Sequence, residues 1–253
     1  MPVLEVAGLP VHHERRGDGP PLVLLHGGLG GSEAWGALLD LLAAAGFDVV
    51  APDRRGHGRT PDVEGPLSYA GMAEETAAFL DALAPGPAHV VGWSDGAAVG
   101  ALLAMSRPDL VARLVLVGQY FDDGGKVPGS FLDDLEAMRH DPPAALRDHY
   151  AAVSADGPEH FPVFLGKTLD LWAAEPRFDL DAFAGVRAPT LVLQGDRDLV
   201  RLEHSAQVAA TVPDGRLAVL PGTHALPQES PALVAALVTA FLRGELPGTA
   251  SWD

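Results

Sequence analysis

The chain has 253 residues, with 17 Lys and Arg against 34 Asp and Glu, a formal net charge of −17 and no Cys. Its hydrophobic fraction of 47% is typical of a globular protein and too high for a disordered chain. The negative charge argues against binding to nucleic acid or to anionic membranes, because both need clustered Lys and Arg. The absence of Cys excludes disulfides, thiolate metal sites, iron–sulfur clusters and a Cys nucleophile.

The N-terminus has no apolar run behind a basic start, so we expect no signal peptide. The longest apolar stretches are far shorter than a membrane span. These observations predict a soluble cytoplasmic protein.

Eight short apolar segments predict strands. In chain order they cover residues 3–6, 11–14, 22–26, 48–51, 89–93, 114–118, 190–194 and 216–220. The first two, separated by Gly8-Leu9-Pro10, predict an antiparallel hairpin. Several later segments are apolar at consecutive positions, as in parallel strands that are covered on both faces.

Amphipathic segments between the strands predict helices over 33–45, 69–83, 95–106 and 231–242. Ser32 and Ser68 can cap the first two, Gly46 can end the first, and Pro108 follows the third. Strands that alternate with helices predict βαβ units with right-handed crossovers. The expected fold is α/β, a three-layer αβα sandwich around a mostly parallel eight-stranded sheet.

One segment, residues 120–186, has helical patches at 131–139, 144–153 and 161–172 but no convincing core strand. We expect it to be a helical cap or lid inserted into a core of residues 1–119 and 187–243, with 244–253 as a frayed tail. The insertion carries 13 Asp and Glu against 5 Lys and Arg, so −8 of the net −17 lies there. This acidity is either a solvated outer face or an entrance that disfavours anionic substrates.

The most specific motif is Gly92-Trp93-Ser94-Asp95-Gly96, which follows a predicted strand and opens a predicted helix. This is the G-x-S-x-G nucleophile elbow in its expected context, where a strained turn exposes the Ser hydroxyl. Side chains at the two Gly positions would collide with neighbouring strands. The helix also points its N-terminal amides at the Ser, where negative charge develops during acyl transfer.

With this elbow the chain resembles the α/β-hydrolase family, over about residues 22–118 and 187–242. The family order of nucleophile, acid and histidine implies a triad of Ser94, Asp198 and His224. Asp198 and His224 follow the strands 190–194 and 216–220. Because the carboxyl ends of parallel strands share one sheet edge, all three side chains are expected to meet there.

Alternatives for the acid remain open at this stage. The family pattern Gly-x-x-Asp favours Asp198, but Asp196 lies only two residues earlier. Asp122 and Asp123 follow the strand 114–118, where some members of the family carry the acid.

The resemblance also implies two backbone N–H groups that bind the oxyanion. One is the amide of Asp95, after the nucleophile. The other comes from the loop His26-Gly27-Gly28-Leu29-Gly30, which matches the family's His-Gly-x pattern. We assign it to Gly28, with Leu29 as the runner-up. The same loop does not complete a G-x-G-x-x-G nucleotide motif, because Glu33 stands at the last position.

Two features of the elbow narrow the range of reactions expected of this family. The related haloalkane dehalogenases and epoxide hydrolases have Asp where this chain has Ser94. The elbow is similar to that of biphenyl-hydrolase-like enzymes that act on amino-acid esters, which implies that the Asp95 carboxylate contacts a substrate amine. The alternative is an outward Asp95 that caps helix amides. Residues expected to line the substrate pocket are Leu29, Trp93, Asp95, Phe161, Phe164, Leu165 and Trp172.

We therefore predict a serine hydrolase that needs no cofactor or metal and cleaves a small carboxylic ester through an acyl-enzyme. Its substrate is expected to be a small neutral or cationic molecule. A thioesterase, lactonase, amidase, C–C hydrolase or perhydrolase on the same triad is an alternative, and so is a non-catalytic ligand receptor with this fold.

Overall fold

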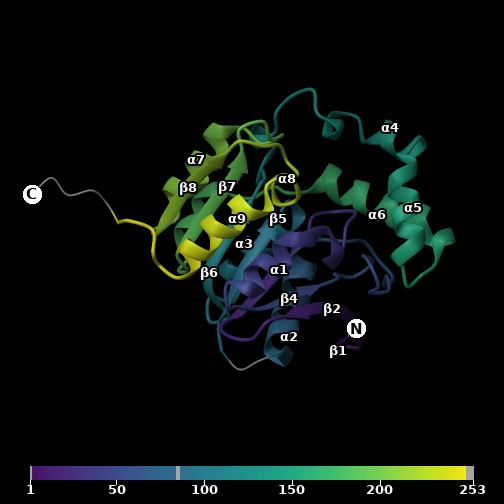
Figure 1. Ribbon diagram of the computed structural model, residues 1–253. Coiled ribbons are helices and arrows are strands. Elements are labelled where there is room, and N and C mark those ends of the chain that lie inside the picture. The colour runs from purple at the N-terminus through teal and green to yellow at the C-terminus, as the bar shows by residue number, and fades with distance from the viewer. Residues whose placement is uncertain (1, 84–85, 249–253) are drawn as a thin grey trace, which may run out of the picture.

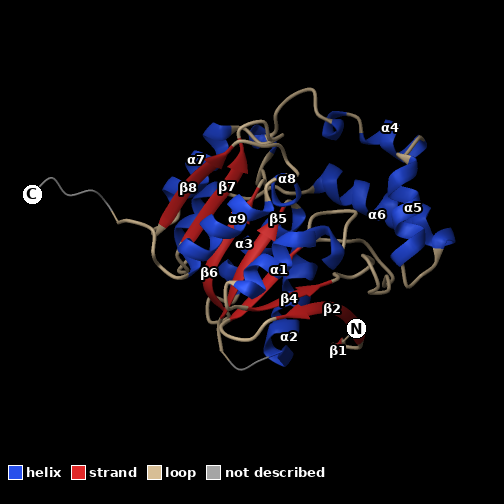
Figure 2. Ribbon diagram, viewed as in Figure 1, coloured by secondary structure: helices blue, strands red, loops and turns tan. Residues whose placement is uncertain are grey.

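Eight strands form one mixed sheet in the computed structural model, which describes residues 2–83 and 86–248 (Figures 1 and 2). The strands are β1 (Val3–Val6), β2 (Leu9–Arg16), β3 (Pro21–Leu25), β4 (Asp48–Pro52), β5 (Ala88–Trp93), β6 (Val111–Val117), β7 (Thr190–Gly195) and β8 (Gly215–Leu220). They lie in the order β1-β2-β4-β3-β5-β6-β7-β8. β2 pairs antiparallel with β1 and β4, and all the other neighbours are parallel. The predicted mostly parallel eight-stranded sheet is therefore confirmed.

The opening hairpin turns one residue earlier than predicted. Ala7 and Gly8 both have positive φ, 51° and 84°, and they form the two-residue turn between β1 and β2. Two positive φ values are typical of the turn that matches the twist of paired strands. Leu9 and Pro10, expected in the turn, belong to β2 and pair with Val6 and Glu5.

Helices cover both faces of the sheet, as expected for a three-layer sandwich (Figure 2). They are α1 (Gly36–Ala44), α2 (Tyr69–Leu83), α3 (Asp95–Ser106), α7 (Leu202–Thr211), α8 (Leu226–Glu229) and α9 (Pro231–Leu242). Consecutive residues of β3 belong to two hydrophobic clusters on opposite faces of the sheet. Leu22 and Leu24 share a cluster with side chains of α1, α8 and α9, whereas Val23 and Leu25 share one with side chains of α2, α3 and α7. This double burial explains the consecutive apolar positions.

The start of the first helix differs from the prediction. Residues Ser32–Trp35 form a 3₁₀ turn, η1, and the α-helix begins only at Gly36. The Ser32 side chain caps neither element; its backbone N–H instead donates to the carboxylate of buried Asp53. By contrast, Ser68 accepts a hydrogen bond from the N–H of Gly71, so the predicted cap of α2 is confirmed.

The segment between β6 and β7 is helical and lies beyond the carboxyl ends of the strands (Figure 1). It contains η2 (Asp123–Gly125), η3 (Phe131–Asp133), α4 (Leu135–His140), α5 (Ala144–Val153), η4 (Pro158–His160), α6 (Phe161–Ala174) and η5 (Leu180–Gly185). The predicted patch 131–139 is divided at Asp134, whose carboxylate caps α4 by accepting from the N–H of Ala137.

Polar contacts attach this segment to the core loop after β4. The Asp62 carboxylate, only 5% exposed, accepts hydrogen bonds from the Lys167 ammonium of α6 at 2.6 Å and contacts His160 Nε2 at 2.8 Å. Apolar side chains of α6 also join the core cluster that α2 and α3 share. The segment is therefore packed onto the sheet domain rather than standing away from it.

No helix within residues 2–83 or 86–248 is long and apolar enough to cross a membrane. Of the predicted tail, residues 249–253 lie outside the described residues.

Adjacent leucines of α1 allow a matched test of this core. Leu42 is fully buried, whereas Leu41 is 38% exposed. Leu42→Ala is expected to lower the free energy of unfolding by about 2–5 kcal/mol, because it leaves a cavity as well as removing apolar contacts. Leu41→Ala should change it by less than about 0.5 kcal/mol. Urea denaturation measures both, and similar losses would contradict the assigned face of α1.

Candidate active site

The turn between β5 and α3 holds Ser94 in a conformation that few non-glycine residues adopt, with φ 54° and ψ −125°. The flanking glycines make this turn possible. A Cβ on Gly92 would lie 2.2 Å from the carbonyl oxygen of Gly96, and one on Gly96 would lie 1.9 Å from that of Leu25 in β3. Any side chain at either position would therefore push the turn away from the sheet.

Three predicted site residues come together at this turn. His224 Nε2 lies 3.0 Å from Ser94 Oγ, and His224 Nδ1 lies 2.8 Å from Asp198 Oδ1. The Asp198 side chain is only 1% exposed and also accepts a hydrogen bond from the N–H of Leu199. A buried carboxylate of this kind orients the imidazole.

The alternative carboxylates lie elsewhere. Asp196 accepts a hydrogen bond from the N–H of Gly222 at 2.9 Å, so it shapes the loop that carries His224. Asp122 caps the 3₁₀ turn η2, and Asp123 pairs with Lys126. Among the four candidates for the acid, only Asp198 contacts His224 within the described part of the chain.

Trp93 connects the elbow to the histidine loop. Its indole N–H donates to the carbonyl oxygen of His224 at 2.8 Å, and its ring packs edge-on against the buried Trp35. The strand that leads to Ser94 therefore also supports the loop that carries the imidazole of His224.

The loop after β3 passes directly beside Ser94. A Cβ on Gly27 would lie 3.3 Å from Ser94 Cβ, and one on Gly28 would lie 2.5 Å from atoms of both Asp95 and Trp172. Within residues 2–83 and 86–248, the N–H groups of Gly28 and Asp95 donate to no protein acceptor. Neither amide is therefore engaged by another acceptor in these residues. Leu29, the alternative to Gly28 as the second amide donor, has a positive φ of 59° and lies in the cavity wall.

The Asp95 carboxylate is directed into the protein rather than outward as the capping hypothesis requires. It is 4% exposed and accepts hydrogen bonds from Tyr69 Oη at 2.8 Å and from Trp172 Nε1 at 3.0 Å. Burial, with the negative charge of Asp95, raises the pKa of Tyr69 well above its ordinary value, so the phenol stays a donor. Asp95 therefore connects α3 to α2 and α6.

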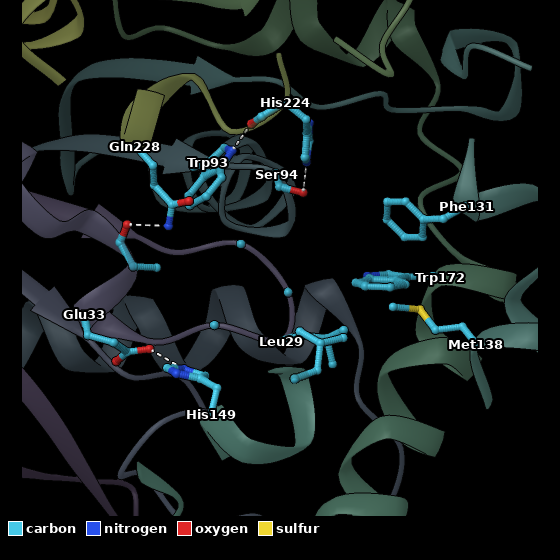
Figure 3. A pocket seen from close by; sticks show the side chains of 15 residues that line it. Leu29, Glu33, Trp93, Ser94, Phe131, Met138, His149, Trp172, His224 and Gln228 are labelled. Atoms are coloured by element: carbon cyan, nitrogen blue, oxygen red, sulfur yellow. Dashed lines mark hydrogen bonds and ion pairs between the residues drawn. The ribbon is translucent and has the colours of Figure 1, made fainter. Parts of the chain in front are cut away.

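A cavity of about 500 Å³ opens at Ser94 and His224 (Figure 3). Of the predicted pocket residues, Leu29, Trp93 and Trp172 line it. Phe161, Phe164 and Leu165 do not; they are buried between α6 and the core, and Phe164 packs against Tyr150. The sequence does not indicate which face of α6 meets the cavity. Lining residues missed by the sequence analysis are Glu33, Ala34, Phe131, Met138, Leu146, His149 and Gln228.

The cavity wall has an apolar side and a polar side. Phe131 packs edge-on against Trp172, and Met138 and Leu146 extend this apolar surface. The Glu33 carboxylate contacts His149 Nε2 of α5 at 2.9 Å, as Figure 3 shows. Residues from η1 and α5 thus meet across the cavity.

Comparison with known proteins identifies the family to which the chain belongs. The sequence profile of the family described as alpha/beta hydrolase fold matches residues 20–156. RutD of Variovorax paradoxus, named as a proposed carbamate hydrolase, is 36% identical over 86% of this chain and 90% of its own length. The pimeloyl-[acyl-carrier protein] methyl ester esterase of Aromatoleum aromaticum is 35% identical over 79% of this chain and 88% of its own. A solved hydrolase from Pseudomonas aeruginosa has 28% identity and a TM-score of 0.75, covering 95% of this chain and 97% of its own.

A mostly parallel sheet with a Ser-bearing elbow at its carboxyl edge and a helical segment over that edge defines the class of protein. The chain belongs to the α/β-hydrolase family. The resemblance inferred from the elbow, and with it the prediction of a hydrolase-family enzyme, is confirmed.

The imidazole of His57 makes the stability of this region depend on pH. Burial and the neighbouring Arg54 cation lower the pKa of His57 to about 3. Between pH 3 and about 6.5 the unfolded chain therefore binds a proton that the folded protein excludes, so stability rises with pH in this window. Each pH unit below about 6 is expected to cost about 1.4 kcal/mol through His57 alone.

His57→Gln removes this contribution, so its free energy of unfolding should depend less steeply on pH between 4 and 6. His140→Gln, at a position with an 82% exposed side chain, is the matched control and should follow the original protein. Denaturation at several pH values measures the slopes, and equal slopes for the original protein and His57→Gln would contradict the argument.

Proposed function

We propose that the protein is a serine hydrolase that cleaves a small carboxylic ester through an acyl-enzyme. The observation that carries this proposal is the continuous contact from Ser94 Oγ through His224 to buried Asp198, at an elbow with two unused N–H groups. An activated hydroxyl beside paired amide donors is suited to forming and stabilising a tetrahedral oxyanion.

Each residue then has a defined task. Asp198 accepts from Nδ1–H of His224, which leaves Nε2 free to take the proton of Ser94 Oγ as the oxygen attacks the ester carbonyl. The carbonyl oxygen becomes an oxyanion held by the N–H groups of Gly28 and Asp95. His224 next gives the proton to the departing alcohol, and the acyl-enzyme forms. Water, deprotonated by His224, attacks the acyl carbon. The bond from this carbon to Ser94 Oγ then breaks as His224 returns the proton to Oγ, which releases the acid and free Ser94.

The cavity supports a small, neutral substrate. Its volume of about 500 Å³ and its apolar side of Leu29, Phe131, Met138 and Trp172 suit a short acyl or alkyl group. The carboxylate of Asp95 already accepts hydrogen bonds from Tyr69 and Trp172, so a substrate amine would have to displace them. The methyl ester esterase and the carbamate hydrolase among the relatives support an ester or a carbamate as the scissile group.

A fluorophosphonate probe tests the proposed nucleophile. Attack by Ser94 Oγ on phosphorus should expel fluoride and leave a stable phosphonyl adduct on that residue alone. Ser94→Ala should form no adduct and should lose hydrolysis of p-nitrophenyl butyrate by at least about 10⁴-fold, because the hydroxyl is the only group that attacks. Intact-protein and peptide mass spectrometry locate the adduct, and a folded protein that stays unlabelled at Ser94 would rule out the proposal.

A panel of esters tests the substrate class. A neutral ester such as methyl butyrate should be hydrolysed with a higher kcat/KM than an amino-acid methyl ester of similar size. Asp95→Asn should reduce both rates by a similar factor, because it disturbs Trp172 rather than a contact with the amine. A selective loss on the amino-acid ester would instead assign the carboxylate to substrate recognition. Thioesters, lactones and carbamates in the same panel distinguish the related activities.

A further inference from the structure

The guanidinium of Arg54, in the loop after β4, is buried beneath the loop that follows β3. It is 5% exposed, and its Nη2 donates to the carbonyl oxygens of His26 at 2.6 Å and of Gly27 at 3.1 Å. Its Nε and Nη1 atoms are buried without a hydrogen-bond partner in the described part of the chain. Burying a cation with unused donors lowers the stability of the folded protein. The contacts that Arg54 does make are therefore expected to have a specific function.

The neighbouring His26 has a defined tautomer. The backbone N–H of Arg54 donates to His26 Nε2 at 3.1 Å, so this nitrogen carries no proton. Burial, with the Arg54 cation, lowers the pKa of His26 well below its ordinary value and keeps the ring neutral. The single ring proton is therefore on Nδ1, which lies 2.7 Å from the carbonyl oxygen of Gly27 and donates to it.

The carbonyl of Gly27 thus receives two hydrogen bonds, one from His26 and one from Arg54. In a trans peptide the C=O and the following N–H point in opposite directions. Holding the Gly27 carbonyl toward Arg54 therefore turns the N–H of Gly28 to the other side of the peptide. Gly27 and Gly28 both line the cavity with Ser94, and Gly27 lies beside Ser94 Cβ.

We propose that Arg54, together with His26, is a positioning residue that orients the Gly27–Gly28 peptide so that the Gly28 N–H meets the oxyanion formed at Ser94. This inference rests on the proposed function and adds a residue to it that does not touch substrate. The cation has a second effect, because its charge interacts favourably with that of the Asp95 carboxylate next to Ser94. It offsets a negative charge that would otherwise oppose the oxyanion.

Arg54→Met removes the donors and the charge while keeping an unbranched side chain of similar length. With p-nitrophenyl butyrate, kcat should fall about 10- to 100-fold and KM should change less than about threefold, because the oxyanion exists only after attack. The inhibition constant of a trifluoromethyl ketone with the same acyl chain, which forms an oxyanion with the Ser hydroxyl, should rise by a similar factor. Arg54→Lys, which keeps a donor and the charge, should recover part of both losses.

Arg55→Met is the matched control. Arg55 is the next residue in the loop and pairs with Glu75 of α2, away from the Gly27–Gly28 peptide. This variant should retain the original kcat and inhibition constant. Thermal unfolding of every variant separates a loss of stability from a loss of positioning.

The outcomes distinguish the inference from the function on which it rests. If the original protein neither hydrolyses the ester nor reacts with a fluorophosphonate, the proposed function fails first. If the original protein does both, and folded Arg54→Met keeps its kcat and its affinity for the ketone, the positioning role of Arg54 is overturned. A rise in the KM of Arg54→Met for the ester with kcat unchanged would also overturn the positioning role, since that pattern indicates altered ground-state binding.

Discussion

The close approach of the elbow helix to β3 is the constraint on which the site depends. Only the hydrogen atoms of Gly96 fit beneath the carbonyl of Leu25, so α3 begins against the end of that strand. The loop that leaves β3 must then pass beside Ser94, and its amides and the hydroxyl are held in one arrangement. The strained backbone of Ser94 is maintained by this packing, since a side chain in place of either glycine would break it.

The other two proposed catalytic groups reach the same edge because the strands are parallel. β7 and β8 end beside each other, and their loops deliver Asp198 and His224 toward the elbow. The hydrogen bond from Trp93 to the carbonyl of His224 then connects the last of these loops to β5. Ser94 and His224, which are more than 100 residues apart in the chain, are thereby held in contact by the fold. In the proposed reaction this avoids a cost of reorganisation.

Much of this architecture could be predicted because its signals are local. Consecutive apolar positions identify doubly covered strands, and a glycine-flanked Ser between a strand and a helix identifies the elbow. Two of the errors have non-local causes. The N–H of Ser32 is bound by Asp53, 21 residues away, and no local pattern records that contact. The hydrogen-bond partners of Asp95 could not be predicted for the same reason, because Tyr69 and Trp172 come from helices that meet Asp95 only in the folded protein.

The residues that line the cavity could not all be predicted from the sequence either. Phe161, Phe164 and Leu165 are as apolar as the residues that line it, and only the docking of α6 decides which of them face inward. Composition identifies an amphipathic helix, but the direction of its faces depends on the surface against which it packs.

The segment between β6 and β7 provides most of the apolar wall of the cavity, whereas Ser94, Asp198 and His224 belong to loops of the sheet domain. Evolutionary variation in that segment can therefore change which molecule the cavity accepts while the proposed catalytic groups are inherited unaltered. Trp172 is the exception, because its indole both lines the cavity and donates a hydrogen bond to the carboxylate of Asp95, next to Ser94. A lineage that diverges in substrate is thus freer to vary Phe131 or Met138 than Trp172.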